Sequence, residues 1–392
     1  MSWSERLRKK INDFEFLELL KGGSIALILK IVGTLLFYAL TLIITNSKGA
    51  SDYGEFAFFI TTTKVLSIIL VFGTDTSALR TIARNIDTPR APEVVNSLSK
   101  SYEVILLFGA LILISALLFQ EQLCRLLDVE PYYLFAICLV ALLFGLVKVH
   151  AQAFRGLKKI AHYGIIEFAL ISLLTLLGIA ILVLGKQSLD LFGLIVIYFG
   201  AVLLTALFSF IAWLKVTGMG GSALLRSMMD TSFKKLMAYI QFSSSFLLAT
   251  SITMFSFWLM QFLLKYYHSS VEVGIYDIVS KLCMFITLPL FAVSAIIAPK
   301  LSSNYSGNEM KRFNANVRQG TLLSLSLGGP VALFLLLFPT FSLSLFGEEF
   351  TSGALALKIL ILGYFFNVAS GPLSLALQMA NHEKIFRNIV FA

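Results

Sequence analysis

The chain has 392 residues, of which 58% are hydrophobic and 14% are charged, and its formal net charge is +9. A soluble protein of this length has no core large enough to hide so much apolar side chain. The apolar runs are long, continuous and arranged in series, which predicts an all-α polytopic membrane protein and disfavours a membrane β-barrel. The three cysteines and four histidines are scattered, so they predict neither a disulfide framework nor a metal site, and no cofactor is expected.

Ten apolar segments are each long enough to cross a bilayer. They cover residues 25–45, 54–73, 102–119, 132–149, 164–184, 191–214, 239–264, 275–298, 319–338 and 353–377. Lysine and arginine gather in alternate connections, whereas the connections on the other side hold only Lys48, Arg125, Lys186 and Lys265. This bias predicts a cytoplasmic N-terminus. It also explains the positive charge through contact with anionic membrane lipids, without a nucleic-acid partner.

Residues 1–23 lack the pattern of a signal peptide, because charges lie on both sides of short apolar steps. Trp3, Leu7, Ile11 and Phe14 recur at helical spacing with basic residues between them. This pattern predicts an amphipathic helix that lies on the cytoplasmic membrane surface.

The first span carries one polar stripe, made of Lys30, Thr34, Tyr38, Thr41 and Thr45. At 100° per residue these side chains fall within a sector of roughly 80°. In lipid such a stripe must face protein or water, so we expect it to line a wet substrate path. The alternative is that the threonines serve helix packing.

The second span carries Lys64 about ten residues from its predicted outer end, roughly 15 Å deep. A lysine at that depth is costly unless it is paired or hydrated. Asp75 lies eleven residues further on, and in a continuous helix it shares the face of Lys64 within about 20°. The two interpretations are a cation that lines a substrate path and a structural salt bridge.

The second half of the chain repeats these features. Residues 215–238 form a glycine-containing, basic connection, which predicts a linker between a first bundle at 24–214 and a second bundle at 239–392. In the span at 239–264, Ser243, Thr250 and Gln261 lie on one face within about 20°. In the next span Asp277 and Lys281 are four residues apart and able to pair.

An internal repeat relates residues 51–85 to residues 271–304. In this register Asp52, Gly54, Phe56, Leu70 and Arg80 fall on Glu272, Gly274, Tyr276, Leu290 and Lys300. The repeat predicts two pseudo-symmetric helical bundles. Residues 377–388 likewise resemble residues 151–162, which two further spans follow in the first half, so we expect the second bundle to be C-terminally incomplete.

Four segments carry a family resemblance: SDYGEFAFFITTTKVLSIILVFGTDTSALRTIAR (51–84), VEVGIYDIVSKL (271–282), LSLFGEEF (343–350) and LQMANHEK (377–384). With them the chain resembles Wzx-type polysaccharide flippases of the multidrug/oligosaccharidyl-lipid/polysaccharide (MOP) exporter superfamily. The resemblance implies two helical lobes around a central cavity in a bacterial inner-membrane protein that is not an enzyme. The cargo it implies is a polyprenyl-diphosphate-linked oligosaccharide, flipped to the outer leaflet by alternating access.

The resemblance also suggests roles for the intramembrane residues. Lys30, Lys64 and Lys281 are the expected cations for the diphosphate, and Asp75 and Asp277 are candidates for coupling to H⁺ or Na⁺. Thr34, Tyr38, Thr41, Ser243, Thr250 and Gln261 complete the expected polar lining. A polysaccharide polymerase and glycosyltransferases are the implied protein partners.

Two other function classes compete with this interpretation. A drug/cation antiporter of the same superfamily should favour acids in its cavity, whereas the intramembrane charge here leans to lysine. A membrane glycan polymerase or ligase is expected to carry a large outer loop with catalytic clusters, and the outer connections here are short and nearly bare.

Overall fold

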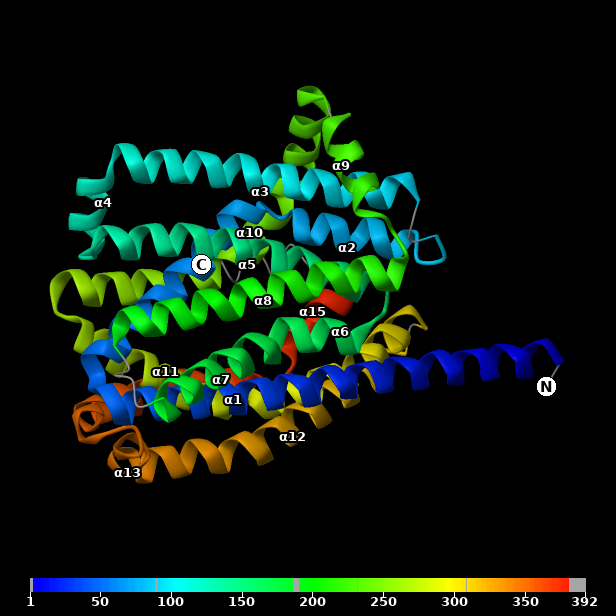
Figure 1. Cartoon of the computed structure of the whole chain (residues 1–392). Helices are drawn as coiled ribbons and strands as arrows, with labels where there is room; N and C mark the ends of the chain where they lie inside the picture. The colour runs from blue at the N-terminus through cyan, green and yellow to red at the C-terminus, as the bar shows by residue number, and fades with distance from the viewer. Residues whose placement is uncertain (1–2, 89–90, 186–189, 231, 308, 381–392) are drawn as a thin grey trace. The chain divides into compact units, whose positions relative to one another are not determined.

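The computed structural model describes residues 3–88, 91–185, 190–230, 232–307 and 309–380. Side chains are described from Ser24 onward, apart from 245, 246, 248–250, 295, 299, 302, 306 and 378. Over these residues the regular structure is entirely helical, as Figure 1 shows, which confirms the all-α prediction. The chain forms two compact units, Leu29–Gly274 and Met1–Ile28 with Ile275–Ala392.

The unit Leu29–Gly274 contains most of the residues discussed below. Its helices are α1 (Trp3–Val71), α2 (Thr74–Arg84), α3 (Pro92–Leu118), α4 (Gln120–Leu127), α5 (Pro131–Gly156), α6 (Ile160–Gly164), the π-helical turn η1 (Ile165–Ala169), α7 (Leu170–Leu184), α8 (Leu191–Thr217), α9 (Gly221–Met229) and α10 (Phe233–Tyr267). Proline stands at the first position of α3 and of α5, where its missing N–H costs nothing. Asp190 caps α8 by accepting a hydrogen bond from the Gly193 N–H at 2.9 Å.

Two interruptions shape the first helices. Within α1, Gly49 adopts φ 75° and ψ −170°, which divides the helix at the connection expected between the first two spans. After α1, Phe72 and Gly73 both have positive φ, so α2 begins as a separate helix. Positive φ suits glycine and strains other residues, so Gly73 fits this break and Phe72 is held there by its surroundings.

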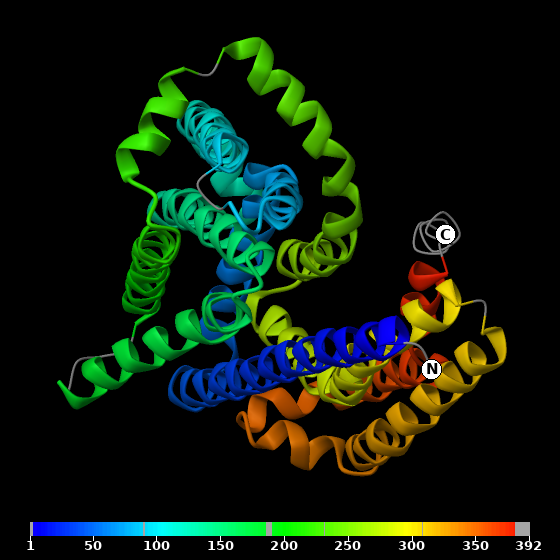
Figure 2. The same cartoon turned by 90° about the vertical axis from the view of Figure 1, so that its right-hand side faces the viewer.

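The core of this unit lies where α2, α3, α5 and α8 meet. Trp213 and Phe154 are fully buried there, with ring centroids 5.6 Å apart in an edge-to-face arrangement. Viewed along the helices in Figure 2, the segment from α9 into α10 runs around the outside of α3. α9 and α10 both pack against α3, and α10 also packs against α2 and α4.

The other unit is formed by α11 (Ser270–Ser306), α12 (Met310–Leu337), α13 (Pro339–Ser344), the 3₁₀ turn η2 (Glu348–Gly353), α14 (Ala354–Ser370) and α15 (Leu373–Met379). Its strongest packing joins α12 to α14. α14 ends before Gly371, which has φ 68° and lies against Thr321 of α12. A side chain at this position would be strained by both the backbone and the contact.

Eight helices in the described part of the chain are long and apolar enough to cross a membrane. One of them, Ser24–Val71, joins the first two expected spans across the kink at Gly49, so the eight include nine of the ten expected segments. The remaining segment, 239–264, lies within the 35-residue helix α10. The multi-pass architecture is therefore confirmed.

The expected domain boundaries stay predictions. Residues from Trp3 to 23 continue α1 as helix, but their side chains lie outside the described residues, as does the segment 381–392. The repeat assigns α10 to a second bundle after a linker at 215–238, whereas contacts group α10 with the residues before it.

Candidate functional site

The repeat-related glycines Gly54 and Gly274 contact each other where α1 crosses α11. A Cβ built on Gly54 would lie 1.8 Å from the Ser270 carbonyl oxygen, and one built on Gly274 would lie 2.4 Å from the Ala50 carbonyl oxygen. Only glycine permits so close an approach of two backbones. The register of the repeat therefore brings equivalent residues together at one helix crossing.

The polar stripe of α1 faces protein over its second half. Tyr38, Thr41 and Thr45 are buried, whereas Leu35 and Ile43 on the other side of the helix are exposed. Thr34 is half-buried, and its hydroxyl donates to the Lys30 carbonyl at 2.8 Å. The second half of the stripe is thus buried against protein, as in the helix-packing alternative, and lining of a substrate path stays a prediction.

Both lysines of the first two spans contact aromatic rings of their own unit. The Lys30 ammonium lies 6.0 Å from the centre of the Phe168 ring, and the Lys64 ammonium lies 5.8 Å from the centre of the Phe37 ring. Both side chains are half-buried. Lys64 contacts Phe37, which lies seven residues after Lys30 in α1. The two lysines therefore lie along one segment of the first span, Lys30 to Phe37, which is about 10 Å long.

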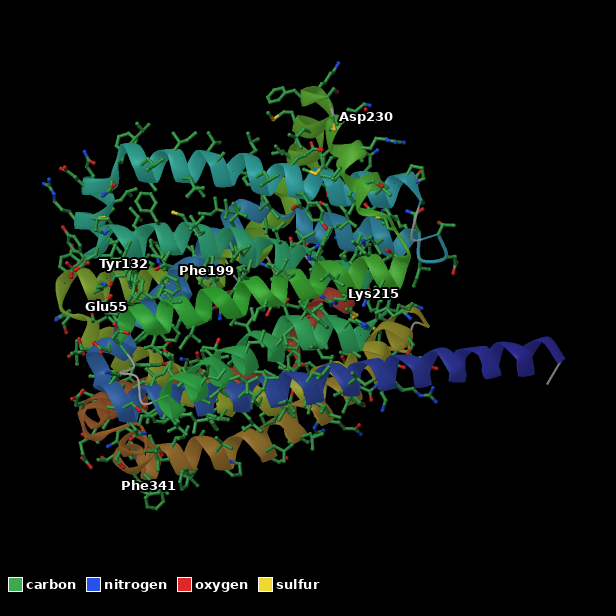
Figure 3. The ribbon with its side chains drawn as sticks, in the orientation of Figure 1. Glu55, Tyr132, Phe199, Lys215, Asp230 and Phe341 are labelled. Atoms are coloured by element: carbon green, nitrogen blue, oxygen red, sulfur yellow. The ribbon has the colours of Figure 1, made fainter. Side chains whose placement is uncertain are left out.

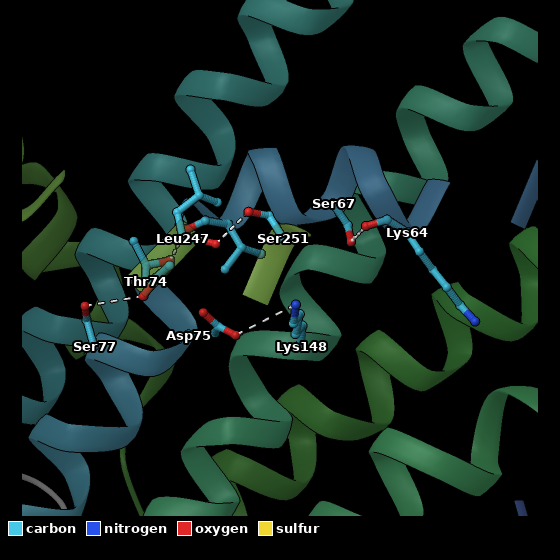
Figure 4. Close-up of polar contacts among 10 residues, drawn as sticks. Lys64, Ser67, Thr74, Asp75, Ser77, Lys148, Leu247 and Ser251 are labelled. Atoms are coloured by element: carbon cyan, nitrogen blue, oxygen red, sulfur yellow. Dashed lines mark hydrogen bonds and ion pairs between the residues drawn. The ribbon is translucent and has the colours of Figure 1, made fainter. Parts of the chain in front are cut away.

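Asp75 Oδ2 lies 4.0 Å from the Nζ of Lys148 in α5, so its recorded ion-pair partner is Lys148. The shared face expected for Lys64 and Asp75 assumed one helix through Phe72 and Gly73, where the backbone breaks. Figure 4 shows the Lys64 side chain directed away from Asp75 and Lys148. Lys64 and Asp75 therefore do not form a direct pair here, although both lie near Glu167.

A carboxylate that the sequence analysis missed, Glu167, lies in the π-helical turn η1. Lys148, Asp75 and Lys64 are among its electrostatic neighbours. The next residue, Phe168, packs closely on α1, because a Cβ built on Gly33 would lie 2.2 Å from the Phe168 carbonyl oxygen. Glu167 has exposed surface although protein atoms surround its carboxylate densely. The sequence did contain a signal for this residue, because Glu167 is a single acid within the apolar span 164–184.

Some polar residues of α10 bind neighbouring helices, whereas Ser244, Ser251 and Ser256 donate to carbonyls of α10 itself. Ser243 is buried, and its hydroxyl lies 2.8 Å from that of Ser77 in α2. Tyr239 lies 3.1 Å from the Ser101 hydroxyl of α3. Gln261 is fully buried, and the Thr250 side chain lies outside the described residues. In this structure Ser243 therefore joins α10 to α2 through a hydrogen bond.

A buried ion pair joins α10 to α1 beside the glycine crossing. The Lys265 ammonium donates to Glu55 Oε2 at 2.5 Å, and their side chains are 2% and 21% exposed. Ser270 donates to the other Glu55 carboxylate oxygen, and Tyr133 donates to the Glu55 carbonyl. Figure 3 shows Glu55 and Tyr132 at the opposite end of the unit from Lys215. The sequence analysis placed Lys265 in an outer connection and missed this pair.

In the other unit Asp277 and Lys281 form the pair expected from their spacing. Asp277 Oδ2 and Lys281 Nζ are 2.6 Å apart, and both side chains are largely buried. Lys281 thus offers a cation whose charge is already balanced on its own helix. Among the described residues no cluster of metal-ligating side chains occurs.

Comparison with known proteins identifies the family. The model of the family described as "Polysaccharide biosynthesis protein" matches residues 19–304. The chain belongs to this family. The MatE family model matches residues 245–392, which places the chain within the MOP exporter superfamily, as the resemblance implied. No curated protein matches.

Solved structures of MATE transporters share the fold. A multidrug resistance MATE family transporter of the MOP superfamily in an inward-facing conformation has TM-score 0.69 and 16% identity over 93% of this chain and 87% of that chain. An outward-facing conformation has TM-score 0.61 and 17% identity over 94% and 84%. The MATE multidrug transporter DinF-BH in complex with R6G has TM-score 0.62 and 18% identity over 95% and 84%. With the two family models, the chain is a multi-pass member of the MOP superfamily, and these solved structures of the same fold are transporters.

Proposed function

We propose that this transporter flips a polyprenyl-diphosphate-linked oligosaccharide from the cytoplasmic to the outer leaflet by alternating access. The family match over residues 19–304 supports the polysaccharide cargo most directly. The protein then resides in a bacterial inner membrane with its N-terminus in the cytoplasm, and it supplies repeat units for surface polysaccharides such as O-antigen or capsule. A polymerase and glycosyltransferases act with it.

The charges around α1 fit an anionic headgroup. Lys30, Lys64 and Lys148 contribute three cations, and the acids near them are Asp75 and Glu167. The group is net positive even though Lys148 is engaged with Asp75. In a medium of low dielectric constant a single excess charge attracts a diphosphate strongly. We assign Lys30 and Lys64 to the diphosphate and half-buried Thr34 to the sugar path, which Tyr38 and Thr41, buried in this structure, would join only in another conformation of the transport cycle.

Energy input is assigned to the acids. Asp75 and Asp277 each lie against a lysine, at 4.0 and 2.6 Å, so binding H⁺ or Na⁺ at either acid would release its lysine from the pair. Such a release changes the charge offered to the cargo, which is the coupling that a gradient-driven transporter needs. Lys281 becomes a cargo cation in this scheme only after Asp277 is neutralised.

The second candidate function is export of a cationic drug. The MatE match over residues 245–392 and the structures of MATE multidrug transporters favour it. Such cargo requires acids in the cavity: Asp75 and Asp277 are paired with lysine, which leaves Glu167 as the acid that would serve a cationic drug. The two candidate functions therefore differ in the charge of the cargo, which is anionic for the lipid-linked oligosaccharide and cationic for the drug.

The decisive experiment measures translocation of a lipid-linked oligosaccharide per folded molecule. We expect Lys64→Arg to retain most transport, Lys64→Gln to lose at least tenfold, and Lys64→Glu to lose more through repulsion of the diphosphate. Lys159→Gln is the matched control, because Lys159 is exposed between α5 and α6. Normal transport by a well-folded Lys64→Gln protein would exclude this role for Lys64. Efflux of a cationic dye without oligosaccharide translocation would establish the antiporter instead.

A further inference from the structure

The short helix α9 is anchored to α3 by one side and exposes apolar residues on the other. Leu224 is buried, and its carbonyl accepts a hydrogen bond from the Ser99 hydroxyl at 3.2 Å. Leu225 and Met229 on the outer side of the helix are 65% and 87% exposed, and Phe233 at the start of α10 is 70% exposed. Large apolar side chains gathered on one exposed corner mark a contact with a lipid or a partner.

A hollow of about 380 Å³ lies beside these apolar side chains, between α9, the start of α10 and the start of α3. Arg226 and Lys235 bring two cations to its wall, and Asp230 brings one carboxylate. Ser227 and Asn96 complete its polar lining, and the serine hydroxyl donates to the asparagine side-chain oxygen at 3.3 Å. Figure 3 shows Asp230 at the end of α9, at the edge of the unit.

Together the cationic hollow and the exposed apolar side chains are complementary to a phospholipid, which has a charged headgroup joined to apolar chains. The cationic hollow suits a phosphodiester, and the exposed apolar row beside it suits the first segment of the acyl chains. Arg226, Lys235 and Asp230 give the lining of the hollow a net charge of +1. Basic side chains near a membrane surface attract anionic lipid by about 1 kcal/mol each.

We propose that the hollow between α3, α9 and α10 binds an anionic glycerophospholipid of the cytoplasmic leaflet. The leaflet rests on the orientation given under the proposed function, whereas the lipid chemistry rests on the residues alone. The Asp230 carboxylate and the Asn96 amide oxygen face the headgroup as acceptors, which suits a headgroup with hydroxyl donors such as phosphatidylglycerol. Because α9 connects α8 to α10, the bound lipid would steady the start of α10.

The test measures the thermal unfolding of the full-length, detergent-purified protein as lipid is added. Phosphatidylglycerol should raise the midpoint in a saturable way, whereas phosphatidylcholine and inorganic phosphate should not. Arg226→Gln with Lys235→Gln should raise the half-saturating phosphatidylglycerol concentration by roughly 10- to 30-fold. The matched control, Lys158→Gln with Lys159→Gln, removes two exposed cations of another basic loop and should leave the response unchanged.

Three results would overturn the proposal. Equal responses of the wild type and the Arg226/Lys235 double variant would show that the hollow does not bind the lipid. Equal losses in both double variants would show unspecific attraction to basic loops. Stabilisation by inorganic phosphate alone would show an anion site without lipid selectivity. The assay contains no cargo, so its outcome stands whether or not oligosaccharide translocation is found.

Discussion

Replacing Gly54 by alanine should destabilise the helix crossing that carries the repeat. The added Cβ would lie 1.8 Å from the Ser270 carbonyl oxygen, about 1.6 Å inside ordinary contact, and 2.9 Å from the Gly274 nitrogen. Both obstacles are backbone atoms, so no side chain can rotate away and the helices must separate. Overpacking typically costs about 1–3 kcal/mol, and separation would also disturb the adjacent Glu55 contacts. We therefore expect a loss of about 3 kcal/mol.

Thermal unfolding of the purified protein, followed by tryptophan fluorescence, measures this effect. A loss of that size should lower the midpoint by about 6–12 °C, using the sensitivity of domains of 150–250 residues. Gly200→Ala is the matched control, because nothing lies within 4 Å of a Cβ built on Gly200 in α8. The control should keep or slightly raise the midpoint, since alanine favours the helix. If Gly54→Ala is as stable as Gly200→Ala, the close crossing is refuted.

Two further predictions concern the ion pair at the C-terminal end of α10 and the orientation of the protein in the membrane. Lys265→Gln should destabilise the protein by about 3–5 kcal/mol by leaving Glu55 without its cation, and adding Glu55→Gln should restore part of the loss; a double variant no better than the single one would contradict the pairing. In a Cys124→Ser background, a cysteine at the exposed position Ser47 should react with an impermeant maleimide in intact cells, and one at the exposed position Ser222 only after permeabilisation. The reverse labelling would invert the orientation.

Local sequence patterns predicted much of the fold, because the signals act within one helix. Hydropathy located the membrane segments, and the four-residue spacing of Asp277 and Lys281 predicted their pair. The repeat register identified Gly54 and Gly274 as equivalent, although their mutual contact needed the structure. Each of these predictions depends on a pattern that is read directly along the chain: an apolar run, a four-residue spacing or a repeated segment.

Contacts between distant segments were beyond the same reasoning. Lys265 and Glu55 are 210 residues apart, and Ser243 and Ser77 are 166 residues apart, so no spacing rule relates them. The partner of Asp75 was missed for another reason. Extending helical geometry from Lys64 assumed a continuous helix, and the positive φ at Phe72 ends it.

The position of α10 shows how the repeat and the contacts differ. Among the described polar contacts that hold this helix to its neighbours are those of Tyr239 with Ser101, Ser243 with Ser77, Trp258 with Thr62, and Lys265 with Glu55. Hydrogen bonds between membrane helices contribute on average about 0.6 kcal/mol each, so the three neutral contacts supply only about 2 kcal/mol. The ion pair offsets much of its own attraction through desolvation. These polar contacts therefore contribute a modest part of the free energy that holds α10 to the first helices, and the packing of α10 on α2, α3 and α4 supplies the rest. The repeat thus assigns α10 to the second bundle, whereas its contacts group it with the residues before it.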